Sequence, residues 1–479
     1  MYFDMPNFQP ALPEMFVLGM ASLIMILDLY LSEKNRVVTY LLSQATLVIA
    51  FVLSLSLYSA TRELTFSDTF VLDPMAGLLK MSVYIAVFTV FLYCNSYLRE
   101  RGMYRGEFFV LALFGVLGMM VMISAHSLLT IYLGLELMSL SLYAMVAMQR
   151  DNRIAAEAAM KYFVLGAMAS AMLLYGMSML YGVTGTLDLG DMSRAVATGH
   201  NDQTLLAFGL VFLLVGVAFK LGAVPFHMWV PDVYHGAPTV VTQYLSTAPK
   251  LAAFAMLMRL MVDGLSGLQL QWHDILVLLA VLSIGVGNVV AIAQSNIKRM
   301  LAYSGISHAG FLLLGVIAGT QEGYAAGMFY AITYVVMGLG GFGMVILMSR
   351  AGFEADSLDD YKGLNQRNPW FALMMMFIML SMAGVPPFVG FWAKLSVLQA
   401  VVDAQQTWLA ILAVVFSVIG AFFYLRVIKL MYFDNPEGQR EFQPLPNVAA
   451  VLSANALAIL WLGAFPGPLM ALCRQALGV

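Results

Sequence analysis

The sequence predicts an all-α polytopic membrane protein of about 14 transmembrane helices, with two inverted five-helix repeats and two broken helices. Of its 479 residues, 61% are apolar and only 11% are charged, whereas soluble domains carry about 25% charged residues. Long apolar runs follow one another from Ala11 to Leu477 with no extended polar linker. This pattern excludes a soluble enzyme, a disulfide-stabilised secreted domain and a disordered chain.

Each predicted span is a run of about 20 mostly apolar residues, the length a helix needs to cross hydrocarbon. The first six spans lie near 11–31, 37–59, 74–98, 108–125, 127–148 and 157–182. The next four lie near 204–235, 239–262, 274–294 and 300–319. The last four lie near 322–349, 370–402, 407–432 and 447–466.

The basic residues between the spans predict the orientation. With the N-terminus outside, fifteen Lys and Arg residues fall on the cytoplasmic side and four on the other side. This bias follows the positive-inside rule, so we expect both termini to face outward. The fifteen are Lys34, Arg36, Arg99, Arg101, Arg105, Arg150, Arg153, Lys298, Arg299, Arg350, Lys362, Arg367, Arg426, Lys429 and Arg440; the four are Arg62, Arg194, Arg259 and Arg474.

The remaining five of the 24 basic residues are the lysines Lys80, Lys161, Lys220, Lys250 and Lys394. All five fall inside predicted spans, where an ionisable group near the helix centre costs about 2.5–3.5 kcal/mol. Lys161 lies near the start of its span and is expected to reach the interface; for Lys80, a functional and a structural role are both open. The other three have apolar sequence on both sides, as does Glu136 in the fifth span, and are functional candidates.

Lysine and glutamate at membrane depth suit proton transfer. Burial disfavours the charged form of both groups, and a nearby opposite charge favours it. A changing distance between Lys220 and Glu136 would therefore load and unload a proton. His308 in the tenth span follows Ser304 by four residues on the same helix face, which extends the candidate relay.

We expect no cofactor and no metal on this chain. His227, Asp232 and His235 match no zinc-binding spacing, and a role in bracing the loop is favoured. The two cysteines, Cys94 and Cys473, are too few to hold an iron–sulfur cluster. The net charge of −3 gives no indication of a nucleic-acid partner.

The seventh and twelfth spans are predicted to be broken helices. Both are too long and contain internal prolines, which remove helical hydrogen bonds. Residues 219–232 and 381–394 share the order Gly, Pro, Trp with a lysine nearby. They lie five spans apart, and because five is odd the two units run in opposite directions, as in inverted repeats. The expected units are 1–107 (helices 1–3), 108–262 (first repeat, helices 4–8), 263–432 (second repeat, helices 9–13) and 433–479 (helix 14).

Residues 220–239, KLGAVPFHMWVPDVYHGAPT, resemble the signature of the antiporter-like, proton-pumping subunits of respiratory complex I. The similarity continues through Pro249-Lys250, 296–304, 308–310 and 384–387. This resemblance implies a fourteen-helix core and proton translocation through Glu136, Lys220, Lys250 and Lys394. It assigns a role less securely to His308, Lys80 and Lys161. The chain has a lysine at position 394 and no lateral amphipathic helix is expected after the fourteenth span. In both features it resembles the subunit N (mitochondrial ND-two) type of the family.

The resemblance implies a non-redox membrane subunit of NADH:quinone oxidoreductase. FMN and iron–sulfur clusters are then expected in partner subunits, whose redox chemistry drives the pump. The expected partners are neighbouring antiporter-like and small hydrophobic membrane subunits, protons and lipid, with no direct contact to NADH. A subunit of a multisubunit Na⁺/H⁺ antiporter or of an ion-pumping hydrogenase is the alternative, and a hydrophobic scaffold without transport is a third possibility.

Overall fold

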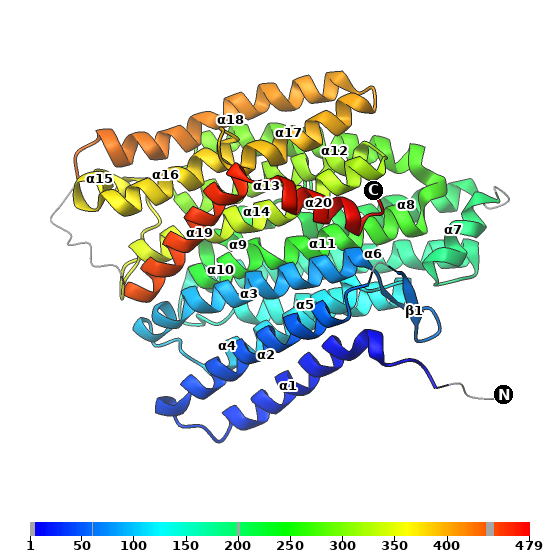
Figure 1. The fold of residues 1–479 in the computed structure, drawn as a ribbon, viewed down its shortest axis with the longest axis horizontal. Coiled ribbons are helices and arrows are strands. Elements are labelled where there is room, and N and C mark those ends of the chain that lie inside the picture. Colours follow the sequence, from blue (N-terminus) through cyan, green and yellow to red (C-terminus); the bar gives the residue numbers. More distant parts are fainter. Residues whose placement is uncertain (1–4, 60, 199–201, 437–444) are drawn as a thin grey trace.

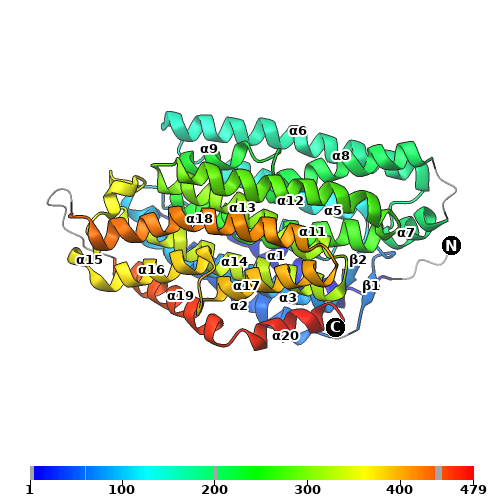
Figure 2. The ribbon, with the colours of Figure 1, turned by 90° about the horizontal axis from the view of Figure 1, so that it is seen from above.

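The apolar segments form long helices that run roughly parallel along one axis in the computed structural model of the chain (Figures 1 and 2). The structure describes residues 5–59, 61–198, 202–436 and 445–479, so Arg440 of the cytoplasmic set lies outside the described residues. Helices suit a membrane because their backbone polar groups pair internally. Helix α1 begins and helix α20 ends at the same end of the bundle (Figure 1).

The helices fall into two successive sets with short elements between them. The first set is α1 (Leu12–Asp28), α2 (Val37–Ser56), α3 (Pro74–Glu100), α4 (Gly106–Ile123), α5 (Leu128–Val146), α6 (Arg153–Thr184), α7 (Leu189–Ala197), α8 (Gln203–Leu221), α9 (Trp229–Gly236), α10 (Thr239–Ser246), α11 (Ala248–Met258) and the π-helix η3 (Arg259–Gly264). The second set is α12 (Gln269–Ile292), α13 (Ile297–Ile317), α14 (Gln321–Met348), α15 (Leu364–Arg367), α16 (Pro369–Ala383), α17 (Val389–Asp403), α18 (Thr407–Phe433), α19 (Pro446–Ala464) and α20 (Gly467–Ala476). Single 3-10 turns lie at η1 (Gln9–Ala11), η2 (Glu33–Asn35), η4 (Ser266–Leu268) and η5 (Leu358–Tyr361).

The predicted all-α membrane fold is confirmed. Among the described residues, 13 helical segments are long and apolar enough to cross a membrane, and α16 is a shorter apolar helix. With α16 and α17 taken as one interrupted span, the structure has the fourteen spans that were expected. Their ends differ from the prediction by a few residues; for example, α6 runs from Arg153 to Thr184 rather than over 157–182.

Both predicted helix breaks are present. Helix α8 ends at Leu221 and α9 begins at Trp229, while α16 ends at Ala383 and α17 begins at Val389. The first residue of each gap is a glycine with positive φ, +71° at Gly222 and +88° at Gly384. Glycine takes this left-handed conformation without steric cost and ends a helix by exposing its last carbonyl groups. These gaps therefore place polar backbone atoms within apolar spans.

Two helix pairs at matching places in the proposed repeats pack in the same way. A Cβ added to Gly118 of α4 would lie 2.4 Å from the backbone nitrogen of Met138 in α5. A Cβ added to Gly287 of α12 would lie 2.6 Å from the backbone nitrogen of Ser307 in α13. Small residues allow helix backbones in membranes to approach closely. The parallel favours the inverted repeat, which stays a prediction together with its boundaries.

A short β-hairpin was not expected from the sequence. Strands β1 (Glu63–Thr65) and β2 (Phe70–Leu72) pair antiparallel. The turn between them, residues 66–68, has positive φ at all three positions. The hairpin precedes α3 and is anchored where the Val71 N–H donates to the Ser124 carbonyl at 2.8 Å. Three-residue strands are too short to give a clear sequence pattern.

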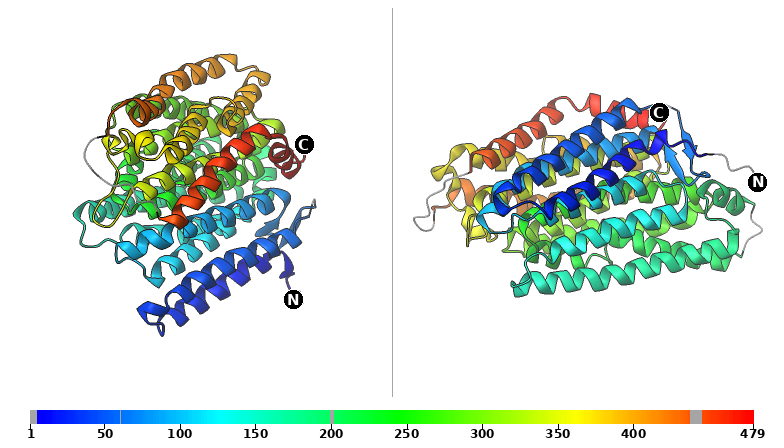
Figure 3. Two further views of the ribbon diagram at one scale, coloured as in Figure 1. Left: turned by 60° about the vertical axis from the view of Figure 1, so that its left-hand side comes forward. Right: turned by 90° about the horizontal axis from the view of Figure 1, so that it is seen from below.

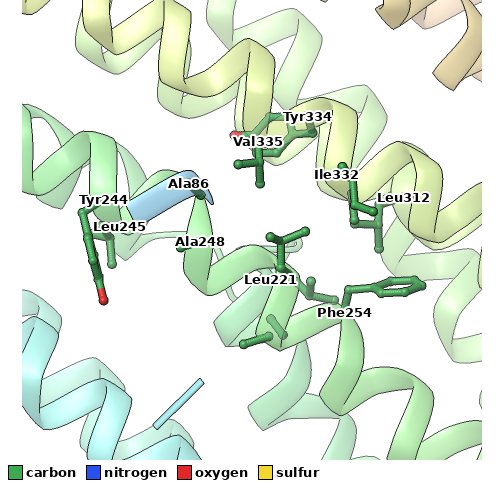
Figure 4. Close-up of a cluster of buried hydrophobic side chains, with 14 of the residues drawn as sticks. Ala86, Leu221, Tyr244, Leu245, Ala248, Phe254, Leu312, Ile332, Tyr334 and Val335 are labelled. Carbon is green, nitrogen blue, oxygen red and sulfur yellow. The ribbon is translucent and has the colours of Figure 1, made fainter. Parts of the chain in front are cut away.

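The centre of the bundle is formed by the segment α10–α11, α13 and α14. In each of these, 94% of the most apolar stretch is buried, against 33% for α18 and α19. Apolar side chains from α3, α8, α10, α11, α13 and α14 meet there (Figure 4). The left view in Figure 3 shows the blue helices α1 and α2 at one edge and the orange α18 at the other. The two breaks thus flank the most buried helices of the molecule.

Candidate functional site

Lys220 lies in the last turn of α8, just before the first break. Its side chain is buried, with 8% of the residue exposed. The Nζ atom donates a hydrogen bond to the Ser139 hydroxyl of α5 at 2.7 Å. It also lies 5.7 Å from the ring centroid of Tyr143, within the range of a cation–π contact. Lys220 therefore bridges the broken helix and α5.

Glu136 lies three residues before Ser139 on α5, on the same side of the helix. Its Oε1 atom is buried and has no hydrogen-bond partner among the described residues. The described contacts include no ion pair between Glu136 and Lys220. The structure thus brings the predicted acid close along α5 to the hydroxyl that Lys220 contacts, without joining the two charges directly.

Lys250 reaches the first break from α11. Its Nζ atom donates to the carbonyl of Leu221, the last residue of α8, at 2.5 Å. A Cβ on Gly222 would lie only 3.3 Å from this Nζ atom. The glycine therefore does two things: its positive φ ends α8, and its missing side chain leaves room for the lysine.

Lys394 lies beside the second break, on α17. Its Nζ atom donates to the carbonyl of Ala383, the last residue of α16, at 2.8 Å and to the Ser417 hydroxyl of α18 at 2.9 Å. A Cβ on Gly384 would lie 2.8 Å from Cδ of the same lysine. Unlike Lys220 and Lys250, Lys394 is only half-buried in the chain.

The two breaks therefore share one arrangement. In each, a lysine ammonium contacts the carbonyl of the last helical residue before a left-handed glycine. Sequence proximity pairs Lys220 with the first break, whereas in the structure Lys250, from the next span, occupies this place. Freed carbonyl groups are suitable acceptors for an ammonium group at membrane depth.

His308 joins a chain of hydroxyl groups between helices. Its Nδ1 lies 2.6 Å from the Tyr330 hydroxyl of α14, and its Nε2 lies 3.2 Å from the Tyr424 hydroxyl of α18. Ser304, expected on the same face, lies 2.5 Å from the same Tyr424 hydroxyl. The helix α13 that carries His308 also places Phe311 5.1 Å beneath the Lys394 ammonium, so this cluster adjoins the second break.

The other two lysines within spans have carboxylate partners. Lys80 is 1% exposed and contacts Glu14 of α1 at 2.8 Å. Lys161 pairs with Asp232 at 2.6 Å and Glu157 at 3.0 Å, and its side chain is 42% exposed. The exposure of Lys161 agrees with the expectation that it reaches the interface. Within the part of the chain that the structure describes, Lys220, Lys250 and Lys394 form no such ion pair.

Two basic residues that were counted toward the orientation are buried in the protein. Arg259 is 2% exposed and pairs with Asp73 at 2.6 Å and Asp263 at 2.9 Å. Lys298 is 2% exposed and donates to the Ala237 carbonyl at 2.7 Å. Both lie at the ends of spans, where the hydropathy pattern alone does not separate a loop from a covered helix end. They therefore contribute less to the orientation than fully exposed charges do.

His227, Asp232 and His235 do not converge on one point. Asp232 accepts hydrogen bonds from Lys161 and from Arg299, the latter at 2.7 Å. His235 lies 3.6 Å from the Asp356 carboxylate. In the described ranges, no group of three or more His, Cys, Asp and Glu side chains is arranged to hold a metal ion. Asp232 connects α9 to α6 and α13.

Sequence reasoning missed the hydroxyl groups that contact the candidate residues. These are Ser139, Ser417, Tyr330 and Tyr424. Ser139 follows Glu136 by one turn, so helical spacing would have indicated it. The other three come from helices distant in the sequence, and only the packing of α14 and α18 brings them to the site.

Comparisons with known proteins agree with this architecture. Residues 125–420 match the family model described as NADH:quinone oxidoreductase/Mrp antiporter, transmembrane. The chain is 59% identical over 478 residues to the NADH-quinone oxidoreductase subunit N of Thioalkalivibrio sulfidiphilus, covering 100% of both chains. A chain of respiratory complex I from Thermus thermophilus matches with a TM-score of 0.83 and 30% identity, over 96% of this chain and 99% of that one. A chain of an archaeal membrane-bound sulfane sulfur reductase matches with a TM-score of 0.85 and 26% identity, over 98% and 97%.

Proposed function

Because this chain belongs to the NADH-quinone oxidoreductase subunit N family, we propose that it translocates protons through Glu136, Lys220, Lys250, His308 and Lys394. The chain is a multi-pass membrane protein. In the proposed assembly it is a membrane subunit of the oxidoreductase, in a bacterial inner membrane with both termini on the periplasmic side. The redox energy comes from FMN and iron–sulfur clusters in partner subunits, and neighbouring membrane subunits transmit it.

One observation supports this proposal most directly. The three lysines selected as functional contact hydroxyl or carbonyl oxygens, whereas Lys80 and Lys161 contact carboxylates. A carboxylate partner holds a lysine in its charged form. A buried amine on neutral acceptors gains no such stabilisation of its charge, so it can release and regain a proton. The ion-paired lysines thus suit a structural role and the other three a transport role.

In this mechanism each group has a separate task. Glu136 modulates the charge on Lys220, whose ammonium contacts Ser139 on the same face of α5. Lys250 passes the proton laterally toward the centre of the bundle, and the His308 cluster connects the two repeats. Lys394, at the second break, passes it to the outer side. The coupling to redox chemistry is long-range, through successive charge changes along the buried axis.

The substitution Lys394→Ala tests the proposal in the assembled complex. We expect it to lower the number of protons translocated per electron in reconstituted vesicles, since the amine at the second break is lost. The matched control is Lys161→Ala, which removes a lysine of a span that is exposed and ion-paired; its ratio should match that of the parent complex. An unchanged ratio in Lys394→Ala would instead support a hydrophobic scaffold without transport.

A further inference from the structure

A polar cavity lies at the end of the bundle that carries most of the basic residues. Its volume is about 520 Å³, and it is lined by the ends of α3, α9 and α13, the α5–α6 connection and residues 352–356. Liquid water occupies about 30 Å³ per molecule, so the cavity can hold many water molecules. We call it the vestibule. Its lining includes Tyr97, Arg101, Gln149 and Glu354.

Glu354 connects the vestibule with the interior. Its side chain is 28% exposed and accepts a hydrogen bond from Arg101 at 2.7 Å. The Tyr97 hydroxyl donates to both carboxylate oxygens, at 3.0 and 3.2 Å. The hydroxyl of Thr239, the first residue of α10, donates to the same carboxylate. One side of Glu354 therefore faces the vestibule and the other contacts α10.

A row of polar side chains continues from Thr239 into the core. Gln243 and Thr247 follow at intervals of four residues, which places them on the side of α10 that carries Thr239. Lys250 comes three residues after Thr247, in the first turn of α11. The first three are fully buried and Lys250 is 5% exposed. The Thr247 hydroxyl donates to the Gln243 carbonyl at 2.6 Å. Polar side chains in an apolar membrane segment cost free energy, so a row of them indicates a functional role.

The middle of this row has an acceptor that is free to bind water. The Gln243 side-chain nitrogen donates to the Leu339 carbonyl at 2.7 Å. Its Oε1 atom is buried and has no protein partner among the described residues. Buried polar atoms are normally satisfied by protein or by ordered water. Water bound there would link the hydroxyl groups on either side of Gln243.

We propose that protons reach Lys250 from the vestibule by way of Glu354, Thr239, Gln243 and Thr247. Glu354 takes a proton from vestibule water. Each hydroxyl or bound water along α10 then accepts one proton and releases another, and the Lys250 amine receives the last. This inference rests on the proposed function and adds an uptake route that does not pass through Lys220.

The first test is Glu354→Gln in inside-out vesicles that contain the whole complex. Glutamine nearly keeps the shape, but only its amide oxygen can accept a hydrogen bond, and it cannot carry the proton, so we expect NADH-driven proton translocation to fall about tenfold. Glu354→Asp should restore most of it. The control is Asp359→Asn, which changes an exposed carboxylate just outside the vestibule; it should pump as the parent does. Parent-like pumping by Glu354→Gln would overturn the route.

A second pair of variants tests the row inside the protein. Gln243→Leu removes the polar atoms at nearly constant volume and is expected to slow pumping. Gln44→Leu in α2 is the matched control, because Gln44 is also buried and also has an unpartnered Oε1. Equal effects of the two substitutions would mean that Gln243 has only a packing role. If Lys394→Ala abolishes pumping while Glu354→Gln and Gln243→Leu leave it intact, the proposed proton translocation is supported and the proposed uptake route is contradicted.

A labelling experiment does not depend on either variant folding. Gln149→Cys places a thiol on the vestibule wall, while Cys94 and Cys473 are buried. We expect a charged, membrane-impermeant thiol reagent to slow pumping when it is added to inside-out vesicles, whose cytoplasmic face is outward. The same reagent should have no effect on right-side-out vesicles. Labelling without inhibition, or labelling only from the opposite face, would contradict the proposal.

Discussion

The two helix breaks have the same backbone plan but differ in which helix supplies the lysine and in how deeply it is buried. At the first break the lysine comes from α11 and is 5% exposed. At the second it comes from α17, the continuation of the broken span itself, and is half-buried. The amine at the first break is therefore enclosed within this chain, while the amine at the second is partly exposed at its surface. This difference matches an internal carrier at Lys250 and a terminal one at Lys394.

Arginine substitutions should separate the two lysines most strongly. Lys250→Arg must fit a larger, planar group where the ammonium lies 2.5 Å from a carbonyl, and arginine does not release its proton. We expect proton translocation to fall about tenfold or more. Lys394→Arg should also lose proton translocation, since its guanidinium keeps its proton, but it has more room and should assemble normally. The measurements are the initial rate of NADH-driven acidification and the yield of assembled complex, and equal yields would contradict the distinction between the breaks.

Alanine at the two left-handed glycines should give the next largest effect. Gly222→Ala combines a positive φ with a Cβ 2.9 Å from Val230 Cγ2, and we expect a loss of stability of about 2 kcal/mol. At Gly384 the new Cβ meets the flexible side chain of Lys394, which can move, so the expected loss is about 1 kcal/mol. Thermal unfolding of the purified complex in detergent would measure both. A larger effect at Gly384 would show that the second break is the more tightly packed.

The tryptophans that follow the breaks predict a smaller difference. The Trp229 indole N–H donates to the Phe219 carbonyl of α8 at 3.0 Å, and the residue is 2% exposed. Trp392 donates instead to the Gly463 carbonyl of α19 at 2.8 Å and is 38% exposed. Trp229→Phe should cost about 1 kcal/mol because it removes a buried hydrogen bond, although the Phe219 carbonyl keeps the hydrogen bond from the Gly222 N–H at 3.0 Å. Trp392→Phe should cost less, because the exposed Trp392 ring is less tightly packed than that of Trp229; unfolding temperatures would show the order.

The smallest expected effect is a pH dependence at the loop beside the first break. The nearby His235 ring and then the hydrogen bond from Asn296, against the effect of burial, hold the pKa of Asp356 below its usual value. A lowered pKa in the folded state stabilises the protein above the unfolded value of about 3.9, and this stability is lost as the pH falls through the folded value. Asp356→Asn should therefore flatten the acid side of a plot of unfolding temperature against pH. No change in slope would show that Asp356 does not contribute.

The sequence was sufficient for the spans and the breaks, while the choice of lysines stays a prediction. Each depends on a local property: the length of an apolar run, a proline within it, or a charge far from its ends. Contacts that join distant segments could not be predicted from the sequence. The hydrogen bond from Lys250 to the Leu221 carbonyl joins residues 29 positions apart, and the contact between Tyr424 and His308 joins residues 116 positions apart. No periodic pattern encodes such pairs, and the same holds for the burial of Arg259 and Lys298.

The β-hairpin shows the same limit on a smaller scale. Its strands have three residues each, too few for alternation to be recognised. What holds it is the Ser124 carbonyl at the end of α4, which is distant in the sequence. Local propensity sets the long helices, and tertiary contacts set the short elements between them.

The buried pair of Glu14 and Lys80 has a consequence for how the chain enters the membrane. Glu14 lies in the first turn of α1 and Lys80 in the second turn of α3, and the two groups contact each other at 2.8 Å. During synthesis α1 emerges first, and its carboxylate has no counter-ion until α3 follows. Each charge alone opposes insertion, whereas the pair satisfies both. The final depth of α1 is therefore set only when α3 has been made, so the first three helices form one unit of assembly.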